Sequence, residues 1–118
     1  MQDYTKLLVW QKGHKLAVEI RMLCIRNPKR GFGDLSEQIR KSSSSVSANI
    51  SEGCGAASNV EFLQFLRDAR KSNLETGNHL RQARDTGYFD RRRASALLER
   101  NDEIGRMLSG LMRRVRGD

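Results

Sequence analysis

The chain has 118 residues and a mass of 13.5 kDa, which is the size of one domain. One proline and an aromatic content of 6% argue against a β-sandwich, which needs many turns and aromatic strands. Basic residues outnumber acidic ones by 22 to 14, and the resulting net charge of +8 favours a polyanionic partner.

The two cysteines, Cys24 and Cys54, have no CxxC spacing, so the sequence indicates neither a zinc ribbon nor a disulfide framework. The start of the chain lacks the basic and apolar pattern of a signal peptide, and no long apolar window could cross a membrane. We therefore expect a cytoplasmic protein with reduced thiols and no membrane partner.

Apolar periodicity predicts a first helix over residues 6–26. Its stripe follows steps of four and three: Val9, Gly13, Leu16, Ile20 and Leu23. The helix should end at Asn27, because the residue before a proline avoids the helical conformation. Trp10 lies on the flank of the stripe, and we expect it to anchor the core between helices.

A second helix is predicted over residues 35–52, with Asp34 as its cap. The serine run Ser42–Ser45 could be a flexible linker, but the apolar period continues through it in phase. We therefore predict that these serines are helical and that their small side chains allow close packing. Gly53 and Gly55 should end the helix.

The third helix is predicted over residues 59–86, with Ser58 as its cap and Gly87 after its end. The fourth is predicted over residues 91–115, with Asp90 as its cap. Four amphipathic helices joined by short loops predict a single all-α domain over residues 1–118, an antiparallel up-down-up-down four-helix bundle.

Three asparagines, Asn49, Asn73 and Asn101, fall at seam positions on three different helices. In one interpretation they lie at the edge of the seam and reach water. In the other they form a buried polar layer that sets helix register or subunit number, as a seam asparagine does in coiled coils.

The sequence offers little for catalysis or metal binding. His14 and His79 stand beside no nucleophile motif, so we expect no enzyme activity. Metal sites in four-helix bundles use two Glu-x-x-His pairs, whereas this chain offers only the pair Glu75 and His79. Glu52 could add a further ligand only if its helix aligns with theirs. We expect no metal and no cofactor, and we interpret Glu75 and His79 as an exposed hydrogen-bonded pair.

Basic residues are the more informative feature, because arginine and lysine clusters neutralise phosphates without reading sequence. They could also form a solvated face or meet an acidic partner protein, with no nucleic acid involved. Exposed aromatic residues that would stack on bases are scarce. The candidate residues for binding RNA or DNA are Arg40, Lys41, Arg67, Arg70, Lys71, Arg81, Arg84, Arg113 and Arg114.

Residues 45–53, SVSANISEG, resemble the SIPANIAEG signature of the four-helix-bundle proteins of the 23S rRNA intervening-sequence family. Ser47 stands where that family usually has proline, and Gly33-Asp34 lengthens the loop before the second helix. Further matching segments cover nearly the whole chain: residues 8–12, 35–40, 61–62, 65–66, 69–72, 74–75 and 87–88.

The resemblance implies a four-helix bundle that assembles as a ring-shaped homopentamer. It also implies kinship with the accessory variability-determinant proteins of diversity-generating retroelements, which bind a reverse transcriptase and nucleic acid. The signature positions Asn49, Glu52 and Gly53 would then form a ligand or partner site. We favour a structural interpretation: Asn49 bonds across the bundle, Glu52 pairs with a basic residue and Gly53 is a left-handed cap.

The residues also predict self-association, because two helices carry more apolar surface than one stripe can bury. Leu8 and Ile25 lie outside the main face of the first helix, and Leu63 and Phe65 outside that of the third. A closed homo-oligomer would cover these residues and repeat the basic residues by symmetry.

Overall fold

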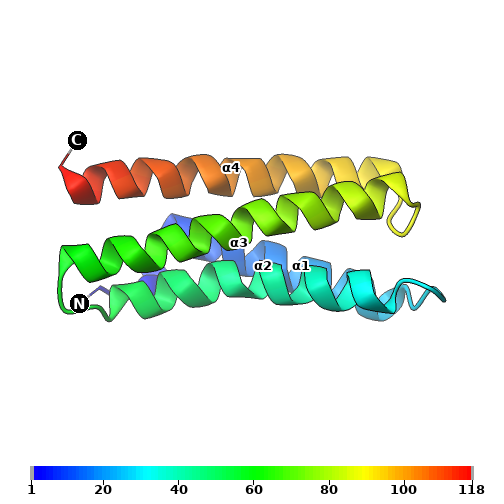
Figure 1. The fold of residues 1–118 in the computed structure, drawn as a ribbon, viewed down its shortest axis with the longest axis horizontal. Coiled ribbons are helices and arrows are strands. Elements are labelled where there is room, and N and C mark those ends of the chain that lie inside the picture. The colour runs from blue at the N-terminus through cyan, green and yellow to red at the C-terminus, as the bar shows by residue number, and fades with distance from the viewer. Residues whose placement is uncertain (1, 118) are drawn as a thin grey trace.

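The computed structural model describes residues 2–117, so the two ends of the domain predicted over residues 1–118 lie outside the described part. A 3₁₀ turn, Tyr4–Lys6, precedes four helices: α1 (Leu8–Arg26), α2 (Gly33–Cys54), α3 (Asn59–Asp85) and α4 (Arg91–Arg116). Successive helices run in opposite directions along an axis of 45 Å, and both chain ends lie at the same end of the bundle (Figure 1). The predicted all-α four-helix bundle is confirmed.

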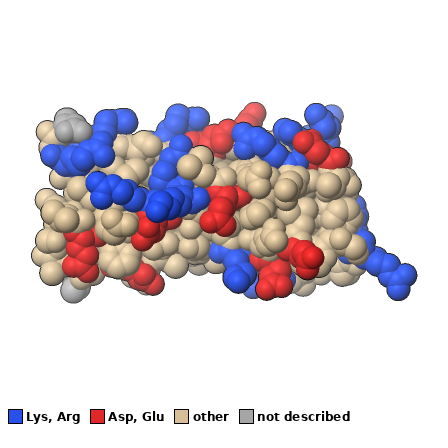
Figure 2. Space-filling view, in the orientation of Figure 1, with Lys and Arg blue, Asp and Glu red and all other residues tan. Residues whose placement is uncertain are grey.

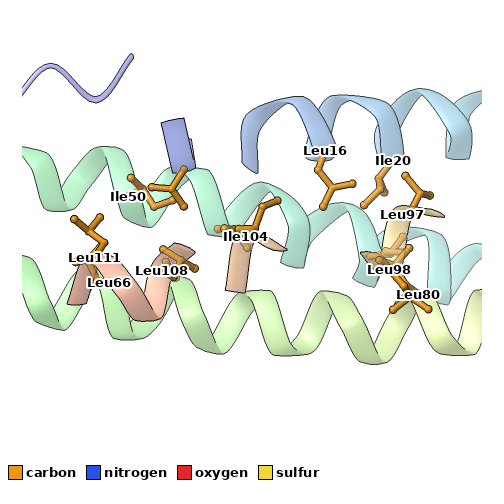
Figure 3. Packing of buried hydrophobic residues seen from close by; sticks show 14 of the residues in the cluster. Leu16, Ile20, Ile50, Leu66, Leu80, Leu97, Leu98, Ile104, Leu108 and Leu111 are labelled. Atoms are coloured by element: carbon orange, nitrogen blue, oxygen red, sulfur yellow. The ribbon is translucent and has the colours of Figure 1, made fainter. Parts of the chain in front are cut away.

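The apolar stripes of all four helices meet in one core. Figure 3 shows labelled side chains from each helix converging on the interior. Fully buried members come from every helix: Ile20, Ile39, Ile50, Leu66, Leu80 and Leu108. Burial of such side chains is the main favourable contribution to folding. Within residues 2–117 no helix is long and apolar enough to span a bilayer.

Two predicted caps are confirmed. The Ser58 hydroxyl accepts a hydrogen bond from the backbone N–H of Glu61 at 3.2 Å, and α3 begins at the next residue, Asn59. The Asp90 carboxylate accepts one from the N–H of Arg93, also at 3.2 Å, at the start of α4. Each cap satisfies a backbone donor that the first helical turn leaves unpaired.

The expected start of α1 was wrong by two residues. Asp3 accepts a hydrogen bond from the N–H of Thr5 at 3.1 Å and starts the separate 3₁₀ turn. Leu7 is extended, so the α-helix begins only at Leu8. The Asp3 cap starts a separate turn, so the α-helix does not extend back to Lys6 as the apolar periodicity alone predicted.

The expected ends of α2 were also wrong, because the helix is longer in both directions. Its first turn is closed by a bond from the N–H of Ser36 to the carbonyl oxygen of Phe32 at 2.9 Å, and Asp34 lies inside that turn rather than capping it. Gly53 is helical and buried, whereas Gly55 caps the end of the helix, as predicted. The three glycines with positive φ lie elsewhere, at residues 31, 87 and 117.

The serine run lies inside α2, as predicted, and two of its members contact α3. The hydroxyl of Thr76 donates to Ser42 Oγ at 3.0 Å, and that of Ser72 donates to Ser45 Oγ at 2.9 Å. Ser42 and Thr76 are buried. Small side chains with mutually satisfied hydroxyls let α2 and α3 approach closely.

One end of the bundle is sealed by loop residues. Tyr88 and Phe89 lie in the short α3–α4 connection, yet both are buried. The Tyr88 ring stacks on Phe32 of the α1–α2 loop, with ring centroids 4.9 Å apart. Asn27 Nδ2 donates to the carbonyl oxygen of Tyr88 at 2.8 Å. These contacts join the two loops and close the core.

Two expectations about apolar residues were wrong. Trp10 is only half-buried, and it packs against the edge of the core with its ring stacked on His14 at 4.7 Å. Leu63 lies within the core. The exposed apolar residues of α3 are instead Val60 and Leu74, whereas Leu8 and Ile25 of α1 are exposed as predicted.

Candidate functional site

The polar feature at the centre of the α3–α4 interface is a pair of asparagines. Asn73 Nδ2 donates to the backbone oxygen of Asn101 at 2.9 Å and to its side-chain Oδ1 at 3.0 Å. Asn101 Nδ2 donates in return to the backbone oxygen of Asn73 at 3.0 Å. Both side chains are buried, so two of the three seam asparagines form the polar contact that the second interpretation describes.

Asn49 does not join this pair, and the expectation that it bonds across the bundle was wrong. Its Nδ2 donates back to Ser45 of its own helix, to the backbone oxygen at 2.9 Å and to Oγ at 3.1 Å. Local bonding of this kind competes with contacts to other helices, since a short amide side chain reaches its own preceding turn easily.

Two glycines create space around the asparagine pair. On α4, a Cβ added at Gly105 would lie 2.6 Å from both Arg70 Nη1 and Asn73 Oδ1. On α3, a Cβ added at Gly77 would lie 3.3 Å from Asn101 Nδ2 and 3.1 Å from Arg81 Nη1. Without side chains at these two positions, polar groups of α3 and α4 reach into the interface.

Above the pair, α3 and α4 form a groove of about 470 Å³. Figure 2 shows a cluster of lysine and arginine left of the centre of the visible face, with acidic side chains beside it and further basic side chains along the upper edge. We call this feature the arginine groove. Its lining residues are Arg70, Asn73, Leu74, Gly77, Arg81, Asn101, Asp102, Arg106, Ser109 and Arg113.

The groove is strongly positive. Four arginines line it against a single carboxylate, that of Asp102. In the described part of the chain none of the four forms an ion pair. Arg70 is half-buried and its Nη1 donates to Asn73 Oδ1, so the asparagine pair holds this guanidinium in place. Guanidinium groups that outnumber the carboxylates on the walls of a groove concentrate positive potential inside it.

The structure brings together three of the predicted binding residues, Arg70, Arg81 and Arg113. The others lie apart from the groove. Arg40 is half-buried and donates to the backbone oxygen of Ser36 at 3.2 Å. Arg84 pairs with Asp85 at 2.8 Å, which lowers the pKa of that carboxyl. Outside the groove are also Lys41, Arg67, Lys71 and Arg114.

Sequence reasoning missed Arg106, the fourth arginine of the groove. A signal was present, because Arg106 lies seven residues before Arg113 and two helical turns place such residues on one face. On α3 the spacing of Arg70, Gly77 and Arg81 is likewise helical. That these two faces meet depends on how the helices pack.

The structural roles expected for Glu52 and Gly53 were wrong. Glu52 is exposed and forms no ion pair with any residue from 2 to 117. Gly53 is not a left-handed cap but a point of close approach. A Cβ there would lie 2.9 Å from Phe62 Cδ1 and 3.0 Å from Phe65 Cβ, so glycine lets the end of α2 contact the start of α3.

The interpretation of Glu75 and His79 as a hydrogen-bonded pair was also wrong. His79 Nδ1 is buried and has no hydrogen-bond partner in the described structure. Across residues 2–117 there is no group of three or more histidine, cysteine, aspartate or glutamate side chains that could hold a metal ion. Cys24 and Cys54 are buried free thiols.

Comparison with known proteins identifies the family. The family model of the 23S rRNA-intervening sequence protein matches residues 5–110. The chain belongs to the 23S rRNA-intervening sequence protein family. The search of curated proteins returned no match.

A solved structure of this type has the same fold. It is a protein of unknown function from the S23 ribosomal protein family of Bacteroides thetaiotaomicron. The two chains superpose with a TM-score of 0.81 at 28% sequence identity, over 89% of this chain and 98% of the other. Membership of the 23S rRNA-intervening sequence protein family agrees with the resemblance found in residues 45–53.

Proposed function

We propose that this protein is a non-enzymatic nucleic-acid-binding protein that contacts the phosphate backbone of RNA or DNA through the arginine groove. The observation that carries the proposal is the convergence of four arginines from two helices on a groove that a single carboxylate, that of Asp102, also lines. Guanidinium groups match phosphate oxygens in geometry and charge, and they remain charged at every physiological pH.

The lining of the groove favours contact with the backbone over recognition of bases. It contains no aromatic side chain on which a base could stack, and its one large apolar residue is Leu74. Sequence-tolerant binding through phosphates needs only positive charge at the correct spacing. We therefore expect little preference among sequences and a strong dependence on salt.

The test is a binding titration of a labelled RNA hairpin and a DNA duplex at low and at physiological salt. With contacts to four phosphates, affinity should fall by roughly 50- to 150-fold between 50 and 200 mM salt, because each contact releases condensed counterions. An affinity that does not change with salt, or no binding at low salt, would reject the proposal. A partner protein retained after nuclease treatment would then support the alternative of an acidic protein partner.

A charge-matched pair of variants locates the interface. Arg113→Gln removes one positive charge from the groove, whereas Arg92→Gln removes one from the opposite end of α4, outside the groove. Loss of one phosphate contact should lower the salt slope by about 0.9 in Arg113→Gln and leave it unchanged in Arg92→Gln. Equal effects of the two substitutions would show that binding depends on net charge alone.

We also propose that the protein acts as a closed homo-oligomer, with the pentamer implied by the family resemblance as the first expectation. The support comes from the side of the bundle where α1 faces α4. A groove of about 430 Å³ lies there, and its lining includes Leu7, Leu8 and Met107. Leu8 in this lining is 56% exposed, so the groove presents an apolar side chain that a second copy of the chain could cover.

Light scattering coupled to size-exclusion chromatography tests the assembly. A mass five times that of the 13.5 kDa chain would support the pentamer, and a monomeric mass would reject self-association. Leu8→Glu should dissociate the oligomer, because burying an unpaired carboxylate in an apolar interface is strongly unfavourable. The control is Val60→Glu, which places the same charge at another exposed apolar position, on α3.

A further inference from the structure

The arginine groove has a defined floor as well as a charged rim. Asn73 and Asn101 lie at its base, and their hydrogen bonds to each other fix both amides. Gly77 and Gly105 keep that base free of aliphatic side chains. Besides joining the two helices, this floor orders Arg70 through its bond to Asn73, so the base of the groove presents a guanidinium in a fixed position.

We propose that the floor of the arginine groove is a binding site for a single phosphate group, which we call the phosphate seat. The inference rests on the proposed function and adds to it a discrete site, with a phosphoryl oxyanion as the ligand. That oxyanion can come from the backbone of a nucleic acid or from a free molecule such as pyrophosphate or a nucleotide.

Arg70 is the fixed ligand of this seat. It is half-buried, and its bond to Asn73 Oδ1 uses one of its five N–H donors and orients the rest. Asn73 is in turn held by Asn101 from the other helix. A guanidinium that is already ordered loses little conformational entropy when an anion binds.

The other three arginines complete the seat from the rim. Arg81 approaches from α3, and Arg106 and Arg113 approach from α4; all three are exposed. Donors that converge from two helices suit a tetrahedral anion, whose oxygens point in several directions, better than a planar carboxylate. Asp102 opposes an anion with one negative charge but leaves the groove with a large positive excess.

The test is a titration with inorganic pyrophosphate at constant ionic strength, followed by NMR of the side-chain amides of Asn73 and Asn101. Saturable shifts of these amides are expected, because the anion binds directly above them. The same titration with chloride should produce no saturable change. Linear shifts with pyrophosphate, or equal shifts with chloride, would overturn the seat.

Two substitutions that preserve charge distinguish a discrete phosphate seat from general electrostatic attraction by the groove. Arg70→Lys should weaken pyrophosphate binding by about tenfold, because an ammonium group cannot reproduce the oriented fork. Arg67→Lys, on the same helix but outside the groove, should change it by less than about twofold. Arg113→Lys, at an exposed position, gives a second test that preserves charge if Arg70→Lys folds poorly. Equal affinities in all of these variants would overturn the proposal.

Competition identifies the source of the phosphate and separates this inference from the proposed function. Displacement of pyrophosphate by an RNA hairpin would support a backbone phosphate as the natural ligand. Saturable pyrophosphate binding without any binding of RNA or DNA would support the seat and reject the proposed function. Nucleic-acid binding without saturable pyrophosphate binding would leave the proposed function standing and overturn the seat.

Discussion

Asn73 of α3 and Asn101 of α4 each donate a hydrogen bond to the backbone oxygen of the other, at 2.9 and 3.0 Å. The two residues are 28 positions apart, and the bonds form only in one register of the helices. Because both amides are buried, a slip of either helix would leave polar groups unsatisfied. The pair therefore sets how α3 faces α4.

Loss of one member should destabilise the fold. Asn101→Ala should lower the free energy of unfolding by about 2 kcal/mol, since it removes a buried hydrogen-bonding partner and leaves a small void. Urea denaturation measures the change. Asn49→Ala is the control, because its amide bonds only to its own helix and alanine is a better helix former. Equal losses in the two variants would contradict the role assigned to the pair.

The close approach at Gly53 predicts a second effect. Gly53→Ala should cost about 1–3 kcal/mol, because its Cβ would overlap Phe62 and Phe65. Gly55→Ala should be nearly neutral, since its Cβ would have its nearest neighbour, a backbone oxygen, at 3.5 Å. Thermal unfolding of both variants measures the difference. A Gly53→Ala protein as stable as Gly55→Ala would show that α2 and α3 can separate at this point without cost.

The helix cap at Ser58 predicts a smaller effect. Ser58→Ala should cost about 1 kcal/mol, because the N–H of Glu61 loses its acceptor. Ser95→Ala, at an exposed position within α4, should change stability by less than about 0.5 kcal/mol. Chemical denaturation of the two variants provides the comparison, and a loss confined to Ser95→Ala would refute the cap.

The ion pair between α1 and α4 predicts a dependence on pH. Lys12 Nζ lies 2.6 Å from Glu103 Oε1 and, through this bond, lowers the pKa of the carboxyl below its ordinary value of 4.5. The stabilisation is therefore present above that value and is lost as the pH falls through the lowered pKa. Both groups are partly exposed, so the effect should be small and screened by salt.

Glu103→Gln measures this contribution. Its melting temperature should lie below that of the unsubstituted protein at pH 7 and should equal it at pH values where Glu103 is protonated. Glu99→Gln, one turn earlier on α4, is the control, since Glu99 forms no ion pair within residues 2–117. A difference that persists in acid would point to packing rather than charge.

Much of the fold follows from local patterns. Ser58 and Asp90 cap their helices as predicted, because a cap depends on residues three positions apart. The serine run Ser42–Ser45 is helical, as its place in the apolar period predicted. The errors arose where local signals compete: Asp3 started a separate turn, and Gly53 resembled a helix end although it is buried inside one.

The candidate site was predicted only in part. Arg70, Arg81 and Arg113 were predicted from charge, but charge alone also selected Arg84, which is neutralised by its neighbour Asp85. Composition cannot separate these cases, because whether a guanidinium pairs with a carboxylate depends on side-chain geometry. Buried loop residues such as Tyr88 gave no periodic signal at all.

By itself, the sequence determined the four amphipathic helices and their antiparallel order, because periodicity and short loops act over a few residues. Only the tertiary structure decided that Asn73 meets Asn101, that Gly77 and Gly105 open the space beside them, and that Arg70 is held above it. The bonds between Asn73 and Asn101 join residues 28 positions apart, and they depend on the relative rotation and register of two packed helices. Burial of unsatisfied polar groups would be unfavourable in any other register, and this cost is the physical reason that α3 and α4 pack as they do.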